Sequence, residues 1–277
     1  MILTDIHTHT SFSPDGRNDI EEMISQAKAQ NIAYYGIAEH FDYDYLVNGL
    51  TFGGEPATYT DAEKYFSTGR AVQEREKGNL RLLLGCEFGY TANRAAAPLY
   101  KKIIETYRPD FIVNSVHTNK ISDYYYPDAY SNKLKAEAYK EYFDLVLRST
   151  KADYPYDIIA HLGYCSRYAP YKDTKILHAE FKTEIDDILK EIVFRDKILE
   201  VNTAARGSGS EFLPDIDILA RYYDFGGRNV SFASDAHDVK RIAEKRDTVV
   251  AALKEIGFTG VTVPVKGEYL LIPFDEN

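Results

Sequence analysis

Residues 2–10 read Ile-Leu-Thr-Asp-Ile-His-Thr-His-Thr, so that two histidines, His7 and His9, directly follow a short apolar run. The run Ile2–Ile6 is typical of a buried strand. Residues two apart on an extended strand project to the same side, and both imidazoles can therefore bind one metal ion. Such a pair also arises by chance in turns and surface strands, so the metal interpretation depends on the rest of the chain.

Similar apolar runs recur along the chain, separated by longer segments of helical period. The predicted strands are Ile2–Ile6, Ala33–Ala38, Leu80–Cys86, Phe111–Val116, Asp157–Ala160, Ile198–Val201 and Val230–Ala233. The predicted helices are Asp19–Gln30, Asp61–Lys77, Arg94–Tyr107, Leu134–Thr150, Ile176–Arg195, Ile216–Phe225 and Val239–Ile256, and short apolar runs follow at Val261–Val265 and Tyr269–Ile272. This alternation predicts an α/β protein, and it favours a closed, TIM-like (β/α)7 barrel over an open doubly wound sheet.

No repeat or linker-like segment divides the chain, so we expect one domain over residues 1–277. The formal net charge of −10 argues against a nucleic-acid groove, and no segment approaches the roughly 20 apolar residues of a membrane span. Two cysteines, Cys86 and Cys165, indicate a reducing, cytoplasmic setting. We expect neither nucleic acid nor membrane as a partner, and the sequence leaves the oligomeric state open. The 23 tyrosines are expected mostly on the exterior or in clefts.

Residues with metal-binding side chains follow most of the predicted strands. They are His7, His9, His40, Glu87, His117, His161, Asp235 and His237, and the loop after the first strand adds Asp15. The carboxyl ends of barrel strands form one face, where active sites of this fold are built, so we expect these residues to meet there. Any one of them alone could be a core histidine or a turn aspartate, but the whole set favours metal. His178 falls outside it, and Glu39, beside His40, would point to the opposite side as a structural residue.

The motifs around these residues resemble the polymerase and histidinol phosphatase (PHP) superfamily. They are HTHTSFSPDG at 7–16, AEH at Ala38–His40, GCE at Gly85–Glu87, SVH at Ser115–His117, AHLG at Ala160–Gly163 and SDAH at Ser234–His237. The resemblance spans nearly the whole chain and is strongest to the stand-alone histidinol-phosphate phosphatases. Many members have histidine in place of Asp15, and Gly163 departs from a frequent Asp or Pro, which concerns the loop shape and not the ligand.

The resemblance implies a distorted seven-stranded barrel that holds three divalent ions, which could be zinc, manganese or iron. It assigns ligands to three ions: His7, His9, Glu87 and Asp235 to the first; a bridging Glu87 with His117 and His161 to the second; Asp15, His40 and His237 to the third. It also implies a phosphomonoesterase that hydrolyses L-histidinol phosphate in histidine biosynthesis, with a small-molecule phosphate ester as its partner.

The charge of such a centre suits this reaction. Three divalent ions, three carboxylates and one hydroxide sum to about +2, which balances a phosphate monoester dianion. We expect in-line attack of a metal-bridging hydroxide on phosphorus, with Glu87, Asp235 and His117 as catalytic residues. The candidates for protonating the leaving alkoxide are a metal-bound water, Asp235 and an acid that binds no metal.

Substrate contacts are expected from polar residues beyond the strands. Arg206 follows the sixth strand in a loop of small residues, after Asn202, and Arg167 lies six residues beyond His161. A planar guanidinium suits bidentate phosphate binding, and the alternative for each arginine is a solvated surface residue. The segments Phe41–Tyr45 and Asp123–Tyr126 follow strands on the same face, and their rings could stack on an imidazole or simply pack.

Other functions are compatible with parts of this pattern. One alternative is a PHP phosphoesterase acting on another small phosphate ester, a nucleotide or an oligonucleotide end. A second is a metal-dependent amidohydrolase, whose barrel also begins with a paired-histidine motif but usually needs a bridging lysine carbamate where this chain offers Glu87. A non-enzymatic PHP module would lack ligands, and none of the nine is missing.

Overall fold

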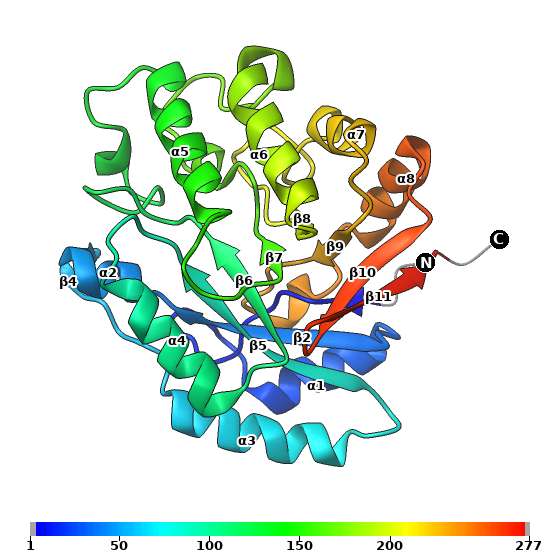
Figure 1. Ribbon diagram of the computed structural model, residues 1–277. Coiled ribbons are helices and arrows are strands. Elements are labelled where there is room, and N and C mark those ends of the chain that lie inside the picture. Colours follow the sequence, from blue (N-terminus) through cyan, green and yellow to red (C-terminus); the bar gives the residue numbers. More distant parts are fainter. Residues whose placement is uncertain (1–3, 275–277) are drawn as a thin grey trace.

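Seven parallel strands form the centre of the computed structural model, which describes residues 4–274 (Figure 1). In their order around the sheet they are β1 (Thr4–Asp5), β2 (Tyr34–Phe41), β5 (Arg81–Gly89), β6 (Phe111–Ser115), β7 (Ile158–Ile159), β8 (Ile198–Asn202) and β9 (Val230–Ala233). Main-chain bonds join the two edges, from Ile6 N to Phe232 O (3.1 Å) and from Asp235 N to His7 O (2.9 Å). The sheet thus closes into the predicted distorted barrel, and only residues 2 and 3 of the first predicted strand lie outside the described residues.

Helices cover the outside of this barrel (Figure 1). They are α1 (Ile20–Ala29), α3 (Ala62–Arg75), α4 (Ala96–Tyr107), α5 (Lys135–Ser149), α6 (Lys182–Phe194), α7 (Ile216–Asp224) and α8 (Arg246–Ile256). Each buries one apolar stripe; in α1 it is Ile20, Met23, Ile24 and Ala27, at the spacing of one helix face. Of the helices described, none is long and apolar enough to cross a membrane.

Two of the predicted helices are too long at their amino ends. Residues 176–195 contain a 3-10 turn, His178–Glu180, before α6, and the His178 main-chain N–H donates to Asp217 (2.9 Å). Residues 239–256 likewise contain a 3-10 turn, Val239–Arg241, before α8. There the Ala243 N–H donates to the buried carboxylate of Asp5 (2.9 Å), and Ala243 adopts a left-handed backbone (φ 58°). Contacts with distant residues therefore override the helical period in both segments.

An antiparallel hairpin of β10 (Gly260–Val265) and β11 (Glu268–Pro273) closes the amino end of the barrel. Lys266 N–H donates to Asp110 O (2.7 Å), just before β6, and Tyr269 donates to Asp157 O (3.3 Å), just before β7. The barrel interior at this end is an apolar cluster of Ile6, Ala38, Leu83, Phe111, Val113, Ile158, Ala160, Ile198 and Val263. Within residues 4–274, the barrel opens to a ligand at its carboxyl end, where a cavity lies.

The expectation that the tyrosines lie mostly on the exterior or in clefts holds only in part, because 12 of the 23 are buried. Seven of the largest fully buried side chains are Tyr35, Tyr65, Tyr100, Tyr124, Tyr139, Tyr142 and Tyr222. Tyr65 shows how the hydroxyl is accommodated, since it donates to the carbonyls of Ile37 (3.0 Å) and Gly85 (2.9 Å). A buried phenol is stable where strand carbonyls accept a hydrogen bond from its hydroxyl, so these rings fill the layer between barrel and helices.

A small insertion after β2 was not predicted. It contains α2 (Tyr43–Asn48) and a hairpin of β3 (Thr51–Phe52) and β4 (Glu55–Pro56). Phe52 and Tyr45 from this insertion line the same cavity as the histidines at the strand ends. The insertion therefore covers part of the open end of the barrel.

Candidate metal centre

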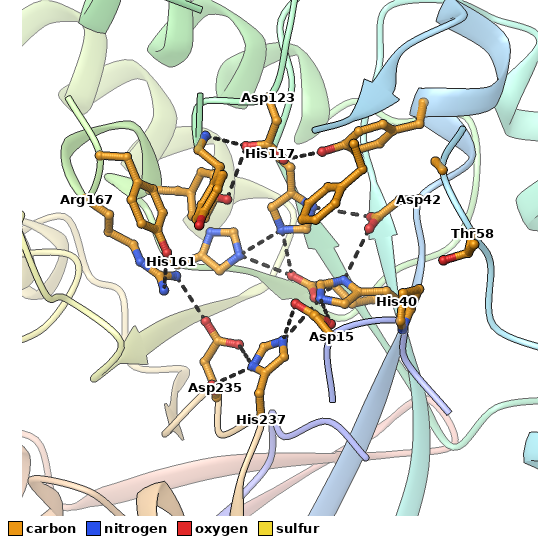
Figure 2. Close-up of a pocket in the computed structure, with 18 of the residues that line it drawn as sticks. Asp15, His40, Asp42, Thr58, His117, Asp123, His161, Arg167, Asp235 and His237 are labelled. Carbon is orange, nitrogen blue, oxygen red and sulfur yellow. Dashed lines mark hydrogen bonds and ion pairs between the residues drawn. The ribbon is translucent and has the colours of Figure 1, made fainter. Parts of the chain in front are cut away.

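A cavity of about 660 Å³ opens at the carboxyl ends of the strands (Figure 2). Its floor contains seven of the nine residues expected as metal ligands, which are Asp15, His40, Glu87, His117, His161, Asp235 and His237. His7 and His9 lie fully buried immediately beneath it. The structure thus brings together all nine residues, as the topology of a barrel predicts.

Glu87, at the end of β5, lies between two groups of histidines. Its Oε2 atom is 3.2 Å from His7 Nε2 and 3.5 Å from His9 Nε2. Its Oε1 atom is 3.1 Å from both His117 Nε2 and His161 Nε2. The Oε2 atom also lies 3.0 Å from His40 Nδ1. The two oxygens of one carboxylate therefore face different imidazoles, an arrangement that suits two metal ions sharing a bridging carboxylate.

A third group lies on the other side of His9. His40 Nε2 and His237 Nε2 are 3.4 Å apart, and Asp15 approaches His237 Nε2 to 3.1 Å and His40 Nε2 to 3.8 Å. The His9 ring is stacked on both of these imidazoles, with centroids 4.2 Å apart in each case, and its Nε2 lies 3.4 Å from Asp235. Asp15 is thus a partner of this group in spite of its place in a turn.

Unusual backbone conformations aim two of these side chains. His161 and Asp235 each lie two residues beyond the end of a strand, β7 and β9 respectively, and both have positive φ (23° and 51°). Residues other than glycine occupy this region rarely, because it crowds the Cβ atom. Such a turn at a strand end directs the side chain over the barrel mouth, and strained residues of this kind cluster at functional sites.

Glu200, on β8, is a buried acid that the sequence analysis missed. Its carboxylate lies 2.7 Å from His7 Nδ1 and accepts from the His161 main-chain N–H (2.9 Å) and the Asn202 amide (2.8 Å). It therefore turns the His7 ring so that Nε2 faces Glu87, as residues behind metal ligands commonly do. The available signal was a charged residue within the otherwise apolar run Ile198–Val201.

Glu39 lies behind the site, on the side of β2 opposite His40. It accepts from the Thr10 N–H (3.0 Å) and from the Ser13 hydroxyl, while Ser13 Oγ is 3.3 Å from His9 Nδ1 and accepts from the His40 N–H (3.0 Å). Burial raises the pKa of Glu39 to about 7, although these hydrogen bonds oppose the rise. The carboxyl group thus holds the first loop against β2.

The carboxylates of the cluster remain ionised in spite of their burial, so the site favours positive charge. Burial raises the pKa of Glu87, but the neighbouring histidines, His7 foremost, outweigh it and hold that pKa well below its usual range. Burial also raises the pKa of Asp235, yet its hydrogen bond with His9 and nearby charges leave it well below the usual value. For His7 burial lowers the pKa, but the charges of Glu200 and Glu87 raise it well above normal. The carboxylates are anionic, and they stabilise cations between them.

The ligand atoms fit a metal centre on geometric grounds. Within residues 4–274, His7 Nε2, His9 Nε2, His40 Nδ1 and Glu87 Oε2 are buried and make no hydrogen bond. Buried polar atoms are normally paired, and a divalent ion is the group that satisfies converging imidazole nitrogens and carboxylate oxygens. The potential ligand sets also include Asp42 with His40 and His117, a carboxylate that the sequence analysis did not single out.

The residues expected to contact substrate are placed differently from one another. Arg167 lies in the cavity wall, where its guanidinium is 3.2 Å from Asp235 and stacks on the Tyr164 and Tyr168 rings. Arg206 is exposed and is not among the residues that line the cavity. Asn202 is buried, and its amide bonds to Glu200 and to the Ala204 N–H (2.8 Å), so that it holds the layer behind the metal ligands.

His178 is the one histidine outside the cluster. Its Nε2 lies 2.7 Å from Asp186, which also bonds to Lys182 (2.7 Å) and Arg221 (2.9 Å). These residues join α6, α7 and the turn before α6 on the outer surface of the barrel, so His178 has a structural partner there.

Aromatic rings form the rim of the cavity. Tyr125 is half exposed, and its ring packs against Phe52 of the β3–β4 hairpin and against Tyr168, with centroids 6.2 and 4.6 Å away. Tyr124, by contrast, is fully buried. The predicted aromatic segments therefore divide between rim and core.

The sequence of the chain matches the model of the PHP domain over residues 5–204. This protein belongs to the PHP domain family. The PHP match ends after β8, so the family model covers the strand ends that supply every cluster residue except Asp235 and His237.

Relatives of this PHP protein match it over most of their lengths. It is 32% identical over 237 residues to a protein of Clostridium acetobutylicum named "probable histidinol-phosphatase", covering 85% of this chain and 87% of that one. It is 29% identical over 270 residues to a Thermotoga maritima protein of the same name, covering 95% and 97%. Its fold matches the crystal structure of histidinol phosphate phosphatase from Lactococcus lactis, complexed with zinc, L-histidinol and phosphate, with a TM-score of 0.84, 25% identity, and coverage of 96% of this chain and 98% of that one.

Proposed function

We propose that this protein is a metal-dependent phosphomonoesterase that hydrolyses L-histidinol phosphate to L-histidinol and phosphate, a step of histidine biosynthesis. The observation that carries the proposal is the likeness, over nearly the whole of both chains, to an enzyme whose structure contains zinc, L-histidinol and phosphate. The names of the two relatives support the same substrate. The cluster of buried ligands at the barrel mouth supports metal dependence.

The proposed cofactors are three divalent ions of zinc, manganese or iron. His7, His9, Glu87 and Asp235 would hold one, Glu87 with His117 and His161 a second, and Asp15 with His40 and His237 a third. When bound, ions of this kind generate a nucleophile from water at neutral pH and neutralise the charge of a phosphate ester. The short distances from the two Glu87 oxygens to their histidine pairs support the bridging role.

The chain's own residues would position the phosphate. Arg167 presents a guanidinium at the cavity wall, beside Asp235. One guanidinium group can donate two parallel hydrogen bonds to two oxygens of a phosphate. The rings of Tyr164 and Tyr168 restrict where this side chain can move. Arg206 remains a predicted phosphate contact that would have to reach the cavity from its exposed loop. Asn202 acts on the substrate through Glu200 and His7 in this proposal.

The rim would receive the organic part of the substrate. Tyr125, Tyr168 and Phe52 present aromatic faces above the metal ligands, and an imidazole stacks favourably on such faces. A substrate that spans the cavity from floor to rim combines a phosphate at one end with a planar ring at the other. L-Histidinol phosphate has this form.

We further propose that residues 1–277 act as one domain in the cytoplasm. The C-terminal hairpin supports the first point, because it closes the same barrel whose opposite end holds the candidate site. The two cysteines, Cys86 and Cys165, are buried free thiols, which suits a reducing compartment.

The test combines metal analysis with phosphate release. Purified protein would be assayed with L-histidinol phosphate and with a panel of nucleotides, sugar phosphates and oligonucleotide ends, after loading with zinc, manganese or iron. We expect two to three ions per chain and the highest kcat/KM for L-histidinol phosphate. Preference for another ester would refute the substrate, and fewer than two ions per chain under metal-replete conditions would refute the bridged centre.

A further inference from the structure

Asp123 is a buried carboxylate in the cavity wall and is not one of the proposed metal ligands. It lies in the loop after β6, at the top of the view in Figure 2, away from His237. The Tyr45 hydroxyl donates to its Oδ2 atom (2.5 Å), and the Tyr125 N–H and the Tyr164 hydroxyl donate to Oδ1 (2.5 and 3.2 Å). Three donors from three segments therefore fix the position of this carboxylate.

All three of these donors are neutral, and within residues 4–274 the carboxylate has no ion-pair partner. Asp123 is nevertheless only 5% exposed, and it lines the cavity. A buried carboxylate without a counter-ion is unfavourable, because hydrogen bonds from neutral groups replace only part of its hydration. An anion that is held in place, lacks a counter-ion and faces a cavity is suited to bind a cationic group of a ligand.

We propose that Asp123 binds the ammonium group of the substrate and so makes the enzyme selective for phosphate esters of β-amino alcohols. The inference rests on the proposed function and deepens it. In L-histidinol phosphate one oxygen and two carbons separate the phosphorus from the ammonium nitrogen, and this amine is protonated at neutral pH. When the phosphate lies on the cavity floor, the ammonium group therefore lies a few bonds away, on the side of the rim.

The surroundings of Asp123 agree with this distance from the floor. The ring of Tyr164, whose hydroxyl bonds to Asp123, packs against the floor residues His117 and His161, with centroids 5.2 and 5.1 Å away. One aromatic side chain thus spans the gap between the metal ligands and the carboxylate. Its face also attracts a cation through the ring quadrupole.

The other acids near the cavity are less suitable. Asp42 lies 3.3 Å from both His40 Nδ1 and His117 Nδ1, so its charge already has partners among the floor residues. Asp44 is completely buried and does not line the cavity. Glu55 lines it from the β3–β4 hairpin but is exposed, and water screens an exposed carboxylate. Among the acids of residues 4–274 that are not proposed as metal ligands, Asp123 best combines burial, a fixed position and access to the cavity.

The experiment measures selectivity for the amine. Wild type and Asp123→Asn would be assayed with two matched pairs of esters: L-histidinol phosphate and its deamino analogue 3-(imidazol-4-yl)propyl phosphate, and O-phosphoethanolamine and ethyl phosphate. We expect wild type to prefer the amine of each pair, and Asp123→Asn to lose at least about tenfold in kcat/KM on the amines alone. Asp128→Asn, an exposed acid of the same loop that does not line the cavity, is the control and should keep the preference.

Several results would overturn the inference. A wild-type enzyme with no preference for either amine would do so, and so would an equal loss on both members of a pair in Asp123→Asn. If that variant unfolds in a thermal scan, Tyr45→Phe, which loosens Asp123 but keeps its charge, should show a smaller loss confined to the amines; an equal loss there also refutes the inference. Failure to hydrolyse L-histidinol phosphate refutes the proposed function instead, while the ethanolamine pair still tests the role of Asp123.

Discussion

The two ends of the barrel are built from the same strands but from opposite kinds of side chain. β5 supplies Leu83 to the apolar cluster at the amino end and Glu87 to the candidate metal centre. β8 supplies Ile198 to the first and Glu200 to the second. Both ends are almost fully buried, yet the amino end is closed by a hairpin of the chain itself, and the carboxyl end faces a cavity.

This difference separates stability from function along each strand. Apolar side chains at the amino end gain free energy when they leave water. Carboxylates and imidazoles at the carboxyl end lose hydration, and their converging atoms lack hydrogen-bond partners until a cation is bound. Substitutions at the two ends should therefore affect different measurements.

The largest effect is expected from Glu87→Gln at the carboxyl end. The amide keeps the shape of the side chain but removes the negative charge that faces five histidines. We expect kcat/KM for L-histidinol phosphate to fall by at least about 10³-fold, and about two bound ions per chain to be lost. Phosphate release and elemental analysis of the purified variant would measure both.

The matched control for this loss is His178→Ala. His178 bonds to Asp186 on the outer surface of the barrel, so its removal should leave both activity and metal content unchanged. Full activity in Glu87→Gln would remove the bridging carboxylate from the proposal, and a loss of metal in His178→Ala would show that the assay does not report on the site.

Leu83→Ala should have the opposite profile at the amino end. Leu83 is 2% exposed within the apolar cluster, and truncation of such a side chain leaves a cavity. We expect the free energy of unfolding in denaturant to fall by about 3 kcal/mol. Below the unfolding transition, kcat/KM and metal content should equal those of wild type; a variant that is folded but depleted of metal would show that the two ends are coupled.

The metal cluster was predictable from the sequence because it depends on topology. Strand ends of a parallel barrel meet on one face, so His7 and His237 become neighbours of the same centre although nearly the whole chain separates them. The strand runs were recognisable from their apolar composition, and all seven occur. The positions of the cluster residues along the strands were therefore enough to predict that they meet, without knowledge of their detailed contacts.

Other features depend on contacts that no local pattern reveals. Glu200 acts on His7 across the barrel, and an acid within an apolar run gives no indication of its partner. The turn before α8 breaks a helical period because Asp5 accepts from Ala243, more than two hundred residues away in sequence. The buried tyrosines were wrongly expected outside, because the strand carbonyls that accept their hydrogen bonds are known only once the fold is formed.

Glu200→Gln should show how far the polar end depends on residues that do not contact metal. The substitution removes the charge that raises the pKa of His7 and weakens the bond that orients its ring. We expect the affinity for the ions next to His7 to fall by about 10- to 100-fold, as for other residues behind metal ligands. Competition with a chelator would measure it.

The control for Glu200→Gln lies at the opposite end of the barrel. Glu268→Gln makes the same chemical change at an exposed position of β11, and it should bind metal like wild type. Equal affinities in the two variants would mean that Glu200 does not orient His7.

The smallest effect is expected at the rim, which belongs to neither end of the barrel interior. Tyr125→Ala removes a half-exposed ring that packs against the rings of Phe52, Tyr126 and Tyr168, so metal content and unfolding free energy should stay the same. If this ring stacks on the imidazole, KM for L-histidinol phosphate rises about fivefold with little change in kcat, since one aromatic contact contributes about 1 kcal/mol. O-Phosphoethanolamine, which has no ring, should show no change in KM, and neither ester should respond to Ile121→Ala, an exposed residue of the same loop outside the cavity lining. An equal rise in KM for both esters would instead show that Tyr125 only shapes the cavity. The rim would then not recognise the imidazole.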